Sequence, residues 1–342
     1  MNKPNAGFPK ARGAVFPAHS PLQEAIGEAD IDPTLRYLTA MTATNQNSSA
    51  GTPAAELEIH ADLARRLLAV QHPELADLPI TPVAAGWDNA IFRLGDDLAL
   101  RLPQRRVAAK LLLHEQRWLP LLKDQLPLRI PAPVRIGVPQ EGYPWPWSVT
   151  PWIAGETADL SPPNSDQGEV LADFFLALHR PAPVDAPRNP YRGVPLADRI
   201  QVFKDRTANL VGKTDLVDAR VRAIWADALA APNDALPTWI QGDPHPRNVL
   251  VVDGRITAVI DWGDMAQGDR ASDLSAIWML LPEREARQRA ITACHSVSAA
   301  TWRRARGWAV LYGVMLLDAG LVDDPRMAAI AEKTFNRLIE GP

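Results

Sequence analysis

Cysteine is almost absent from this sequence, because Cys294 is the only one among 342 residues. A single cysteine excludes a disulfide within the chain and any metal cluster held by several thiolates. We interpret Cys294 as a small buried residue. The scarcity of thiols fits a reducing compartment, so we expect a cytoplasmic protein.

Long apolar runs and blocks of like charge are also missing. No stretch reaches the roughly 18 apolar residues that a membrane helix needs, and the N-terminus lacks the apolar core of a signal peptide. The 36 basic and 40 acidic residues give a net charge of −4 without a long run of either sign. We therefore expect no nucleic-acid partner and no membrane partner, which leaves small molecules.

The first 52 residues differ in composition from the rest. They are rich in Pro, Ala, Ser, Asn and Thr, and "TATNQNSSAGTP" is typical of a polar linker, so we predict that residues 1–52 are disordered. Met41 is an alternative natural start, in which case residues 1–40 would not belong to the natural protein. The remaining length suits a bilobal domain. We predict an N-lobe at 53–150, a hinge connector at 151–156 and a helical C-lobe at 157–342.

The predicted N-lobe mixes helical and strand patterns. A first helix should begin at Thr52-Pro53, a cap residue followed by a proline suited to the first turn. Its apolar side would hold Leu63, Ala64, Leu67, Leu68 and Val70. A second helix is predicted at 106–123. Short apolar runs separated by turn residues predict an antiparallel sheet with strands within 80–86, 89–95, 98–104, 131–139 and 145–153.

Long helical patterns dominate after Gly155. They cover residues 166–180, 197–211, 215–231, 270–281, 283–295, 301–320 and 325–340. One hairpin interrupts them, since Val249–Val252 and Ile256–Ile260 flank Asp253-Gly254, a strong two-residue turn signal. The predicted fold class is α+β, with a small antiparallel sheet and a larger, mainly helical part.

The hairpin brings two polar clusters to one end. Asp243 and Asn248 precede it and Asp261 follows it, so the three side chains can converge. Two carboxylates and an amide oxygen are hard ligands of the kind that Mg²⁺ accepts together with substrate phosphates. One Asp would be left to orient a nucleophile, as phosphoryl transfer requires. The alternative is a polar turn beside an ordinary hairpin, which the joint pattern does not favour.

These residues carry a resemblance to a known family. The segments "QGDPHPRN", "VIDWGD" and "GDRASDLS" resemble the aminoglycoside phosphotransferase family, small-molecule and antibiotic kinases with a bilobal protein-kinase-like fold. The resemblance implies Asp243 as the catalytic base, Asn248 and Asp261 as Mg²⁺ ligands, and Asp273 as a brace for the catalytic loop. A weaker likeness extends over about residues 57–335.

The sequence departs from the family pattern at two positions. Gln241 stands where the family usually has His, and since Gln can also donate and accept hydrogen bonds, we expect activity to survive. Arg247 stands where a small residue is common, which alters the expected shape of the substrate entrance.

A buried ion pair is predicted in the N-lobe. Glu115 lies on the apolar side of its helix, where an unpaired carboxylate would be costly. In "LALRLPQ", Arg101 points away from the face formed by Leu98, Leu100 and Leu102, which makes it the natural partner. The resemblance suggests that Arg101 and Glu115 replace the Lys–Glu pair of protein kinases and position the phosphates. A purely structural ion pair is the alternative.

The remaining site predictions rest on weaker patterns. Gly86, Asp88 and Asn89 would form a turn over the phosphates, and the backbone of Thr150 and Trp152 would contact adenine. His245 and Asp264 are candidate substrate contacts, with a loop histidine and a surface turn as the alternatives.

The sequence thus predicts an ATP-dependent, Mg²⁺-requiring O-phosphotransferase that acts on a hydroxyl of a small molecule, for example an aminoglycoside or macrolide antibiotic. GTP in place of ATP, and a monomer or a homodimer, stay open. One alternative is a nucleotide-binding regulatory protein that has lost catalysis, as Gln241 would allow. Another is a metal-dependent hydrolase, although the chain offers no His-rich ligand set.

Overall fold

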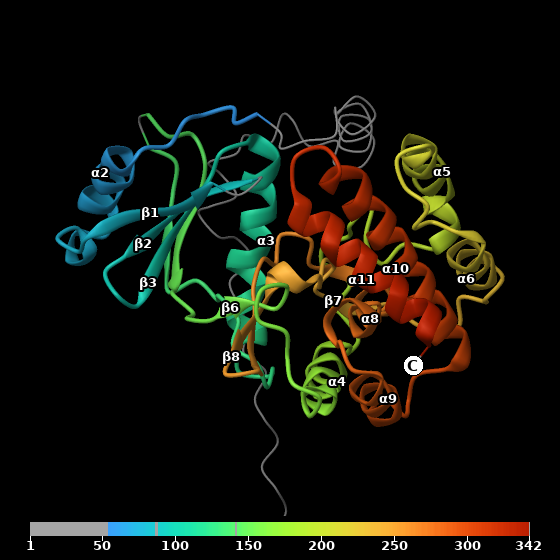
Figure 1. The fold of residues 1–342 in the computed structure, drawn as a ribbon. Helices are drawn as coiled ribbons and strands as arrows, with labels where there is room; N and C mark the ends of the chain where they lie inside the picture. The colour runs from blue at the N-terminus through green and yellow to red at the C-terminus, as the bar shows by residue number, and fades with distance from the viewer. Residues whose placement is uncertain (1–53, 86–87, 141, 342) are drawn as a thin grey trace, which may run out of the picture. The chain divides into compact units, whose positions relative to one another are not determined.

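A computed structural model describes residues 54–85, 88–140 and 142–341 of the chain. The disordered extension predicted for residues 1–52 lies outside these ranges and stays a prediction. The described residues form an antiparallel sheet with helices in the N-terminal part and a mainly helical C-terminal part (Figure 1), which confirms the α+β class. Within the described residues, no helix combines the length and the apolar character that crossing a membrane requires.

The sheet has five strands in the order β1-β2-β3-β5-β4, and all neighbouring strands are antiparallel. Each of the five predicted strand segments contains one of them. Their bounds are β1 Ile80–Ala85, β2 Asn89–Leu94, β3 Leu98–Pro103, β4 Arg135–Gly137 and β5 Trp147–Pro151. The two helices of this part are α2 (Ala61–Gln71) and α3 (Arg106–Leu122), and the 3₁₀ turn η2 (Pro73–Leu75) follows α2.

The start predicted for the first helix is wrong. Residues 54–60 are not helical, and α2 begins at Ala61. The backbone N–H groups of Glu56 and Leu57 donate to the carbonyl of Gln104, directly after β3. These hydrogen bonds attach the stretch to the sheet, so it does not join the helix. Four of the five predicted apolar residues of α2 are buried, whereas Val70 is 65% exposed. The position of a short helix therefore follows its packing against the sheet more than its start signals.

Alternation along β3 divides the side chains between two faces, as predicted. Leu100 and Leu102 join Leu67 and Leu68 of α2 in one apolar cluster. Arg101 lies on the opposite face, where it meets α3. The sheet thus has an apolar face beneath α2 and a more polar face towards α3.

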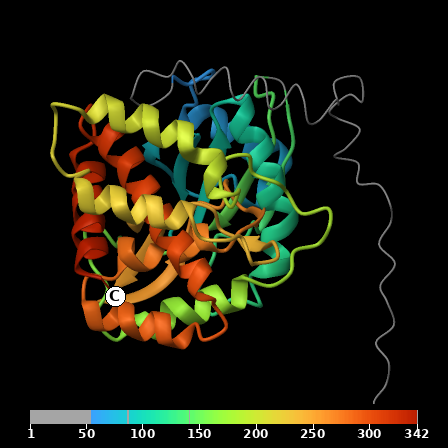
Figure 2. The same ribbon diagram turned by 90° about the vertical axis from the view of Figure 1, so that its right-hand side faces the viewer.

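The helical part contains the seven predicted helical segments. The last has the predicted bounds, the one predicted at 301–320 begins two residues earlier, and the other five are shorter than predicted. They are α4 Gln167–Leu178, α5 Ile200–Leu210 with the 3₁₀ turn η3 (Leu196–Arg199) before it, α6 Ala219–Leu229, α7 Ala271–Leu274 with α8 Ala276–Leu280, α9 Arg284–Ala293, α10 Ala299–Gly320 and α11 Pro325–Glu340. The segment predicted as one helix at 270–281 is thus two short helices that meet at Ser275. The helices α5 and α6 lie side by side (Figure 2), joined by the stacked rings of Phe203 and Trp225.

Two small sheets hold the polar segments of the helical part. β8 (Val249–Val252) and β9 (Arg255–Val259) form the predicted hairpin, with β6 (Glu156–Thr157) added beside β8. Its turn residues Asp253 and Gly254 have φ angles of 50° and 74°, as a two-residue turn of this kind requires. The second sheet, β7 (Thr238–Ile240) with β10 (Ala266–Gly268), was not predicted.

Candidate active site

The loop after β7 is fixed by a buried carboxylate. The backbone N–H groups of Gln241 and Gly242 donate to Oδ2 and Oδ1 of Asp273, at 2.8 and 2.9 Å. Asp273 is fully buried, and the ring of His179 lies 3.2 Å from it. The brace predicted for Asp273 is therefore confirmed, and His179 at the end of α4 takes part in it.

Gly242 is required by the shape of this loop. Its φ angle is 93°, and a Cβ atom there would lie 2.4 Å from the carbonyl oxygen of Asp264. The carbonyl of Gly242 accepts a hydrogen bond of 2.6 Å from the Tyr312 hydroxyl on α10. Any side chain at this position would push the loop away from the segment that follows β9.

Gln241 joins the catalytic loop to the segment after the hairpin. Its side-chain Nε2 donates to the carbonyl of Asp261 at 2.5 Å, and its Oε1 accepts from the N–H of Asp243 at 2.7 Å. The side chain has no exposed surface. The expectation that Gln can donate and accept in place of His is confirmed.

Asp243 and Asn248 face each other across the loop. Nδ2 of Asn248 donates to the carbonyl of Asp243 at 2.9 Å, and the short 3₁₀ turn η4 (Pro246–Asn248) closes the loop. This bond fixes the orientation of the amide, so its oxygen is the atom that remains suited to a metal. The backbone N–H of Ile260 donates to the carbonyl of Asn248, which brings the residue before Asp261 to the same place.

Asp261 has an unusual backbone and a crowded electrostatic environment. Its φ angle of 54° is uncommon for a residue other than glycine and is typical of sites that the surrounding structure holds under strain. Asp261 is exposed to solvent, but neighbouring protein atoms still surround part of its side chain. This surrounding protein raises the pKa of Asp261, and the carboxylates of Asp243 and Asp264 raise it further, against the opposing charge of Arg101.

The residues fit a divalent cation that also binds phosphate oxygens. A cation beside Asp261 would stabilise its carboxylate, whose pKa burial and the neighbouring carboxylates raise. No group of three or more His, Cys, Asp or Glu side chains within residues 54–85, 88–140 and 142–341 is placed to hold a metal by itself. One carboxylate and one amide oxygen, Asp261 and Asn248, suit Mg²⁺, which usually keeps several waters and takes few protein ligands.

Arg101 and Glu115 form the predicted buried ion pair. Arg101 Nη2 donates to Glu115 Oε1 at 3.2 Å, Nη1 makes a second contact with Oε2, and both side chains are buried. Burial alone would lower the pKa of Arg101, but the charges of Glu115 and Asp261 outweigh it, so its pKa is raised. Arg101 therefore stays charged within electrostatic reach of Asp261.

The turn predicted over the phosphates is described only in part, because Gly86 lies outside the described residues. Asp88 forms an ion pair with Arg105, and its carbonyl accepts a hydrogen bond of 2.8 Å from the N–H of Gln104. Asn89 pairs with Pro103 in the sheet, and within the part of the chain that the structure describes its Oδ1 is buried without a hydrogen-bond partner. The phosphate roles of these residues stay predictions.

The backbone of the predicted connector faces two ways. Thr150 pairs with Ala99 of β3, and the N–H of Trp152 donates to the carbonyl of Asp97 at 2.7 Å. The N–H of Trp152 is thus used within the protein, and the adenine contacts of Thr150 and Trp152 stay predictions. Because backbone groups alternate along a strand, Pro151 turns its carbonyl to the other side of β5.

His245 and Asp264 lie beside Asp243. His245 Nε2 is 3.5 Å from Asp243 Oδ2, and His245 Nδ1 accepts from the N–H of Arg247. Asp264 accepts a hydrogen bond of 2.8 Å from Nδ2 of Asn189. The structure brings both residues to the site, while their contact with substrate stays a prediction.

The sequence did not point to three residues of this site. Arg192 lies 3.2 Å from Asp243 and 3.2 Å from Asp264, and the ring of Tyr312 lies beneath its guanidinium. Asn189 and Arg192 belong to a segment without helical or strand periodicity, so no pattern predicted where they lie. The mix of Arg, Asn and Tyr between prolines in "PRNPYRGVP" was the only signal available.

Comparisons with known proteins identify the family of the chain. The model of the phosphotransferase enzyme family matches residues 79–308. A curated relative, "Uncharacterized protein YcbJ" of Bacillus subtilis (strain 168), is 25% identical over 243 residues, which cover 65% of this chain and 76% of that protein.

Solved structures show the same fold. The GDP complex of wild-type aminoglycoside 2′-phosphotransferase-IIIa matches with a TM-score of 0.60 and 18% identity, over 82% of this chain and 99% of that one. The apoenzyme of macrolide 2′-phosphotransferase MphH from Brachybacterium faecium matches with a TM-score of 0.51 and 20% identity, over 82% and 98% of the two chains.

Proposed function

Because the chain belongs to the phosphotransferase enzyme family, we propose that it transfers the γ-phosphoryl group of ATP to a hydroxyl group of a small molecule, with Mg²⁺ as the metal. The observation that carries this proposal is the meeting of Asp243, Asn248 and Asp261 at one end of the hairpin. Aminoglycoside and macrolide phosphotransferases among the similar structures support it through their fold.

Each residue takes one part of the reaction. Asp243 would orient the acceptor hydroxyl and accept its proton, since its carboxylate is partly open to solvent. Asn248 and Asp261 would hold Mg²⁺, which offsets the charge of the phosphate oxygens when it is bound. Arg101, fixed by Glu115, would bind the phosphates of the nucleotide.

The nucleotide would lie between the sheet and the catalytic loop. We retain the limits 53–150, 151–156 and 157–342 for the N-lobe, connector and C-lobe, since β5 ends at Pro151 and β6 begins at Glu156. The Pro151 carbonyl and the Ile153 N–H are further connector groups that would read the adenine edge. Similar structures include both GDP and ADP complexes, so GTP is a second candidate donor.

Thermal unfolding with ATP or GTP, each with and without Mg²⁺, tests the nucleotide site. We expect stabilisation by one nucleotide that depends on the metal, because a ligand that binds only the folded chain raises its stability. Asp261→Asn should weaken this stabilisation. Asp243→Ala should keep it and abolish transfer to any acceptor.

The two alternatives predict different results for the same samples. A regulatory protein without catalysis would bind nucleotide and transfer nothing to a broad set of hydroxyl acceptors. A hydrolase would release phosphate from ATP equally fast with and without acceptor. Gln241 gives little support to the first alternative, because its side chain makes the hydrogen bonds that hold Asp243 and Asp261 together.

A further inference from the structure

The segment between α4 and α5 lies against the catalytic loop. Its backbone is fixed there by two hydrogen bonds, from the N–H of Gln267 to the carbonyl of Pro187 and from the N–H of Asp269 to the carbonyl of Gly193. The segment carries Arg192, and Arg199 follows at the end of η3. Arg192 is thereby placed against Asp243, and Arg199 lies within electrostatic reach of Arg192.

The charge of Arg192 is satisfied by the site itself. Its Nη2 lies 3.2 Å from Asp243 Oδ1 and its Nε lies 3.2 Å from Asp264 Oδ2. Its guanidinium lies over the ring of Tyr312, 4.9 Å from the ring centre. Two carboxylates and an aromatic ring therefore compensate the positive charge of Arg192.

Within the described residues, Arg199 has an aromatic neighbour but no carboxylate partner. It is 7% exposed, its guanidinium lies 5.3 Å from the ring centre of Tyr191, and among residues 54–85, 88–140 and 142–341 no carboxylate or carbonyl pairs with it. The neighbouring Asp198 attracts it without reaching ion-pair distance. Burial first, and then repulsion by Arg192, lower the pKa of Arg199 to about 10.

Comparison with the other buried arginines makes Arg199 an exception. Arg101 pairs with Glu115, Arg287 with Glu340, and Arg304 with Asp269 and Asp234. A buried charge without a partner is costly, so such a group is retained where a ligand supplies the opposite charge. The planar fork of arginine matches the two oxygens of a carboxylate or phosphate.

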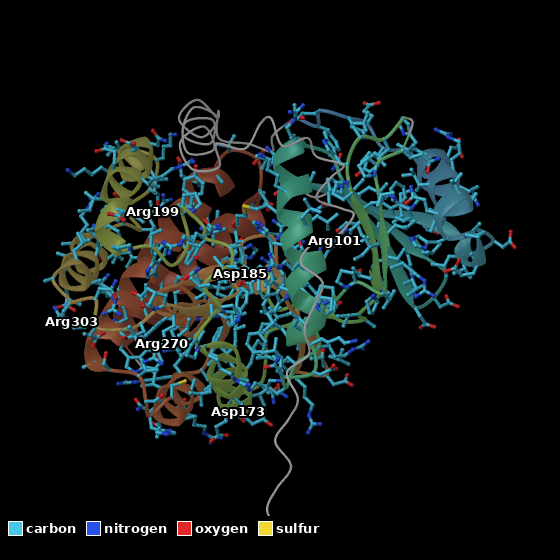
Figure 3. All side chains as sticks on the ribbon, turned by 180° about the vertical axis from the view of Figure 1, so that it is seen from behind. Arg101, Asp173, Asp185, Arg199, Arg270 and Arg303 are labelled. Carbon is cyan, nitrogen blue, oxygen red and sulfur yellow. The ribbon has the colours of Figure 1, made fainter. Side chains whose placement is uncertain are left out.

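We propose that Arg199 binds an anionic group of the acceptor, a carboxylate or a phosphate, so that the phosphorylated molecule is an acidic alcohol. This inference rests on the proposed function, because it places the acceptor beside Asp243. Figure 3 labels Arg199 beside α5 and Arg101 beside α3, so the two cations serve different groups. Polycationic aminoglycosides are poor acceptors in this arrangement, since Arg199, whose charge no carboxylate of the described residues neutralises, would repel their ammonium groups.

The experiment uses the whole chain and two probes, inorganic phosphate and malonate, each titrated against sodium chloride at matched ionic strength. Thermal unfolding is recorded for the wild type, Arg199→Met, Arg101→Met and Arg220→Met. Arg101→Met reports binding of the probe in the nucleotide site. Arg220→Met is the matched control, because Arg220 is exposed and pairs only with its own helix cap, Asp218.

We expect saturable stabilisation of the wild type by at least one probe, which also identifies the preferred anion. In Arg199→Met the dissociation constant of that probe should rise at least about tenfold, as loss of a charge-assisted hydrogen bond implies, and both controls should retain binding. Without the probe, Arg199→Met should be at least as stable as the wild type, because it removes an uncompensated buried charge.

Three results would overturn the inference: no saturable stabilisation of the wild type, undiminished binding in Arg199→Met, or loss of binding in Arg101→Met alone. Titration with Mg²⁺ and ATP on the same samples tests the proposed function separately. If Arg199-dependent anion binding occurs without nucleotide binding, the phosphotransferase proposal and the acceptor role of the anion fall together, and the Arg199 site remains as an anion site of another kind.

Discussion

Gln241 uses both polar atoms of its side chain to join two segments of the site. Its Nε2 reaches the Asp261 carbonyl and its Oε1 receives the N–H of Asp243, in a position without solvent. A buried hydrogen-bonding group that loses its partner carries the full desolvation penalty. The side chain therefore contributes to stability and to the relative placement of the two carboxylates.

Replacement of Gln241 by Leu should lower the free energy of unfolding by about 2–4 kcal/mol, because two buried backbone groups lose their partners. Turnover should fall with it, while Gln241→His should retain both. Urea unfolding and an initial-rate assay measure the two effects. Gln125→Leu is the control, since that amide is exposed and makes its hydrogen bonds, with the Leu121 carbonyl and Arg180, at the surface. A Leu variant as stable and active as the wild type would contradict the bridging role.

The hairpin β8–β9 sets the position of Asp261 through its turn. Gly254 has a φ angle of 74°, and a Cβ atom there would lie 2.3 Å from Nδ2 of Asn164. Gly212 has nearly the same φ angle, 75°, but a Cβ atom there would meet no other atom within 4 Å. The two glycines thus separate the cost of the backbone angle from the cost of the collision.

Gly212→Ala should destabilise the chain by about 1–2 kcal/mol through the left-handed backbone alone. Gly254→Ala should cost more, since Asn164 must also move, and it should weaken nucleotide binding through Asp261. Denaturant unfolding of both variants checks the order. Equal losses in the two variants would mean that the hairpin absorbs the added methyl group.

The helix α3 is attached to β3 by the buried pair Arg101–Glu115. Removing one partner leaves the other charge buried alone, so Arg101→Met and Glu115→Leu should each cost about 3–5 kcal/mol. The double variant should recover most of that stability and still fail to bind nucleotide with Mg²⁺. Unfolding measurements with a nucleotide titration separate the two roles. Nucleotide binding by the double variant would leave the pair a purely structural role.

At the scale of the whole molecule, Cys294 reports on opening of the helical core. It is 1% exposed, and burial raises the pKa of its thiol to about 11, so at pH 8 only about one molecule in a thousand would carry the thiolate. A disulfide reagent should therefore react with native protein far more slowly than with protein unfolded in guanidinium. Rapid labelling of the native chain at pH 8 would show that this core opens locally.

Local chemistry explains which parts of the fold could be predicted. Asp253-Gly254 fixed the hairpin because the turn residues set their own backbone angles, and the hairpin in turn predicted the meeting of Asp243, Asn248 and Asp261. Features that depend on distant contacts escaped prediction. The three-residue strands β7 and β10 are too short to show a period, and the late start of α2 depends on Gln104.

The position of Arg192 could not be predicted for the same reason. Arg192 reaches Asp243 through hydrogen bonds that hold an aperiodic segment against β10, and nothing local encodes that placement. The ion pair between Arg101 and Glu115 could be predicted, because strand alternation places Arg101 on one face and helix periodicity places Glu115 on another. No such periodicity predicts the position of an ion-pair partner that lies in a loop.

The two faces of α3 are held by different kinds of contact. Towards the helical part, its residues Trp118, Leu119 and Leu122 belong to the large apolar core, with Trp118 packed edge-on against Trp239. Towards the sheet it is attached through polar contacts, the Arg101–Glu115 pair and the bond from Gln116 to Ser148. If the sheet tilts, these polar contacts should break before the apolar ones, and α3 should move with the helical part. Arg101 would then separate from Glu115 whenever the proposed nucleotide site opens.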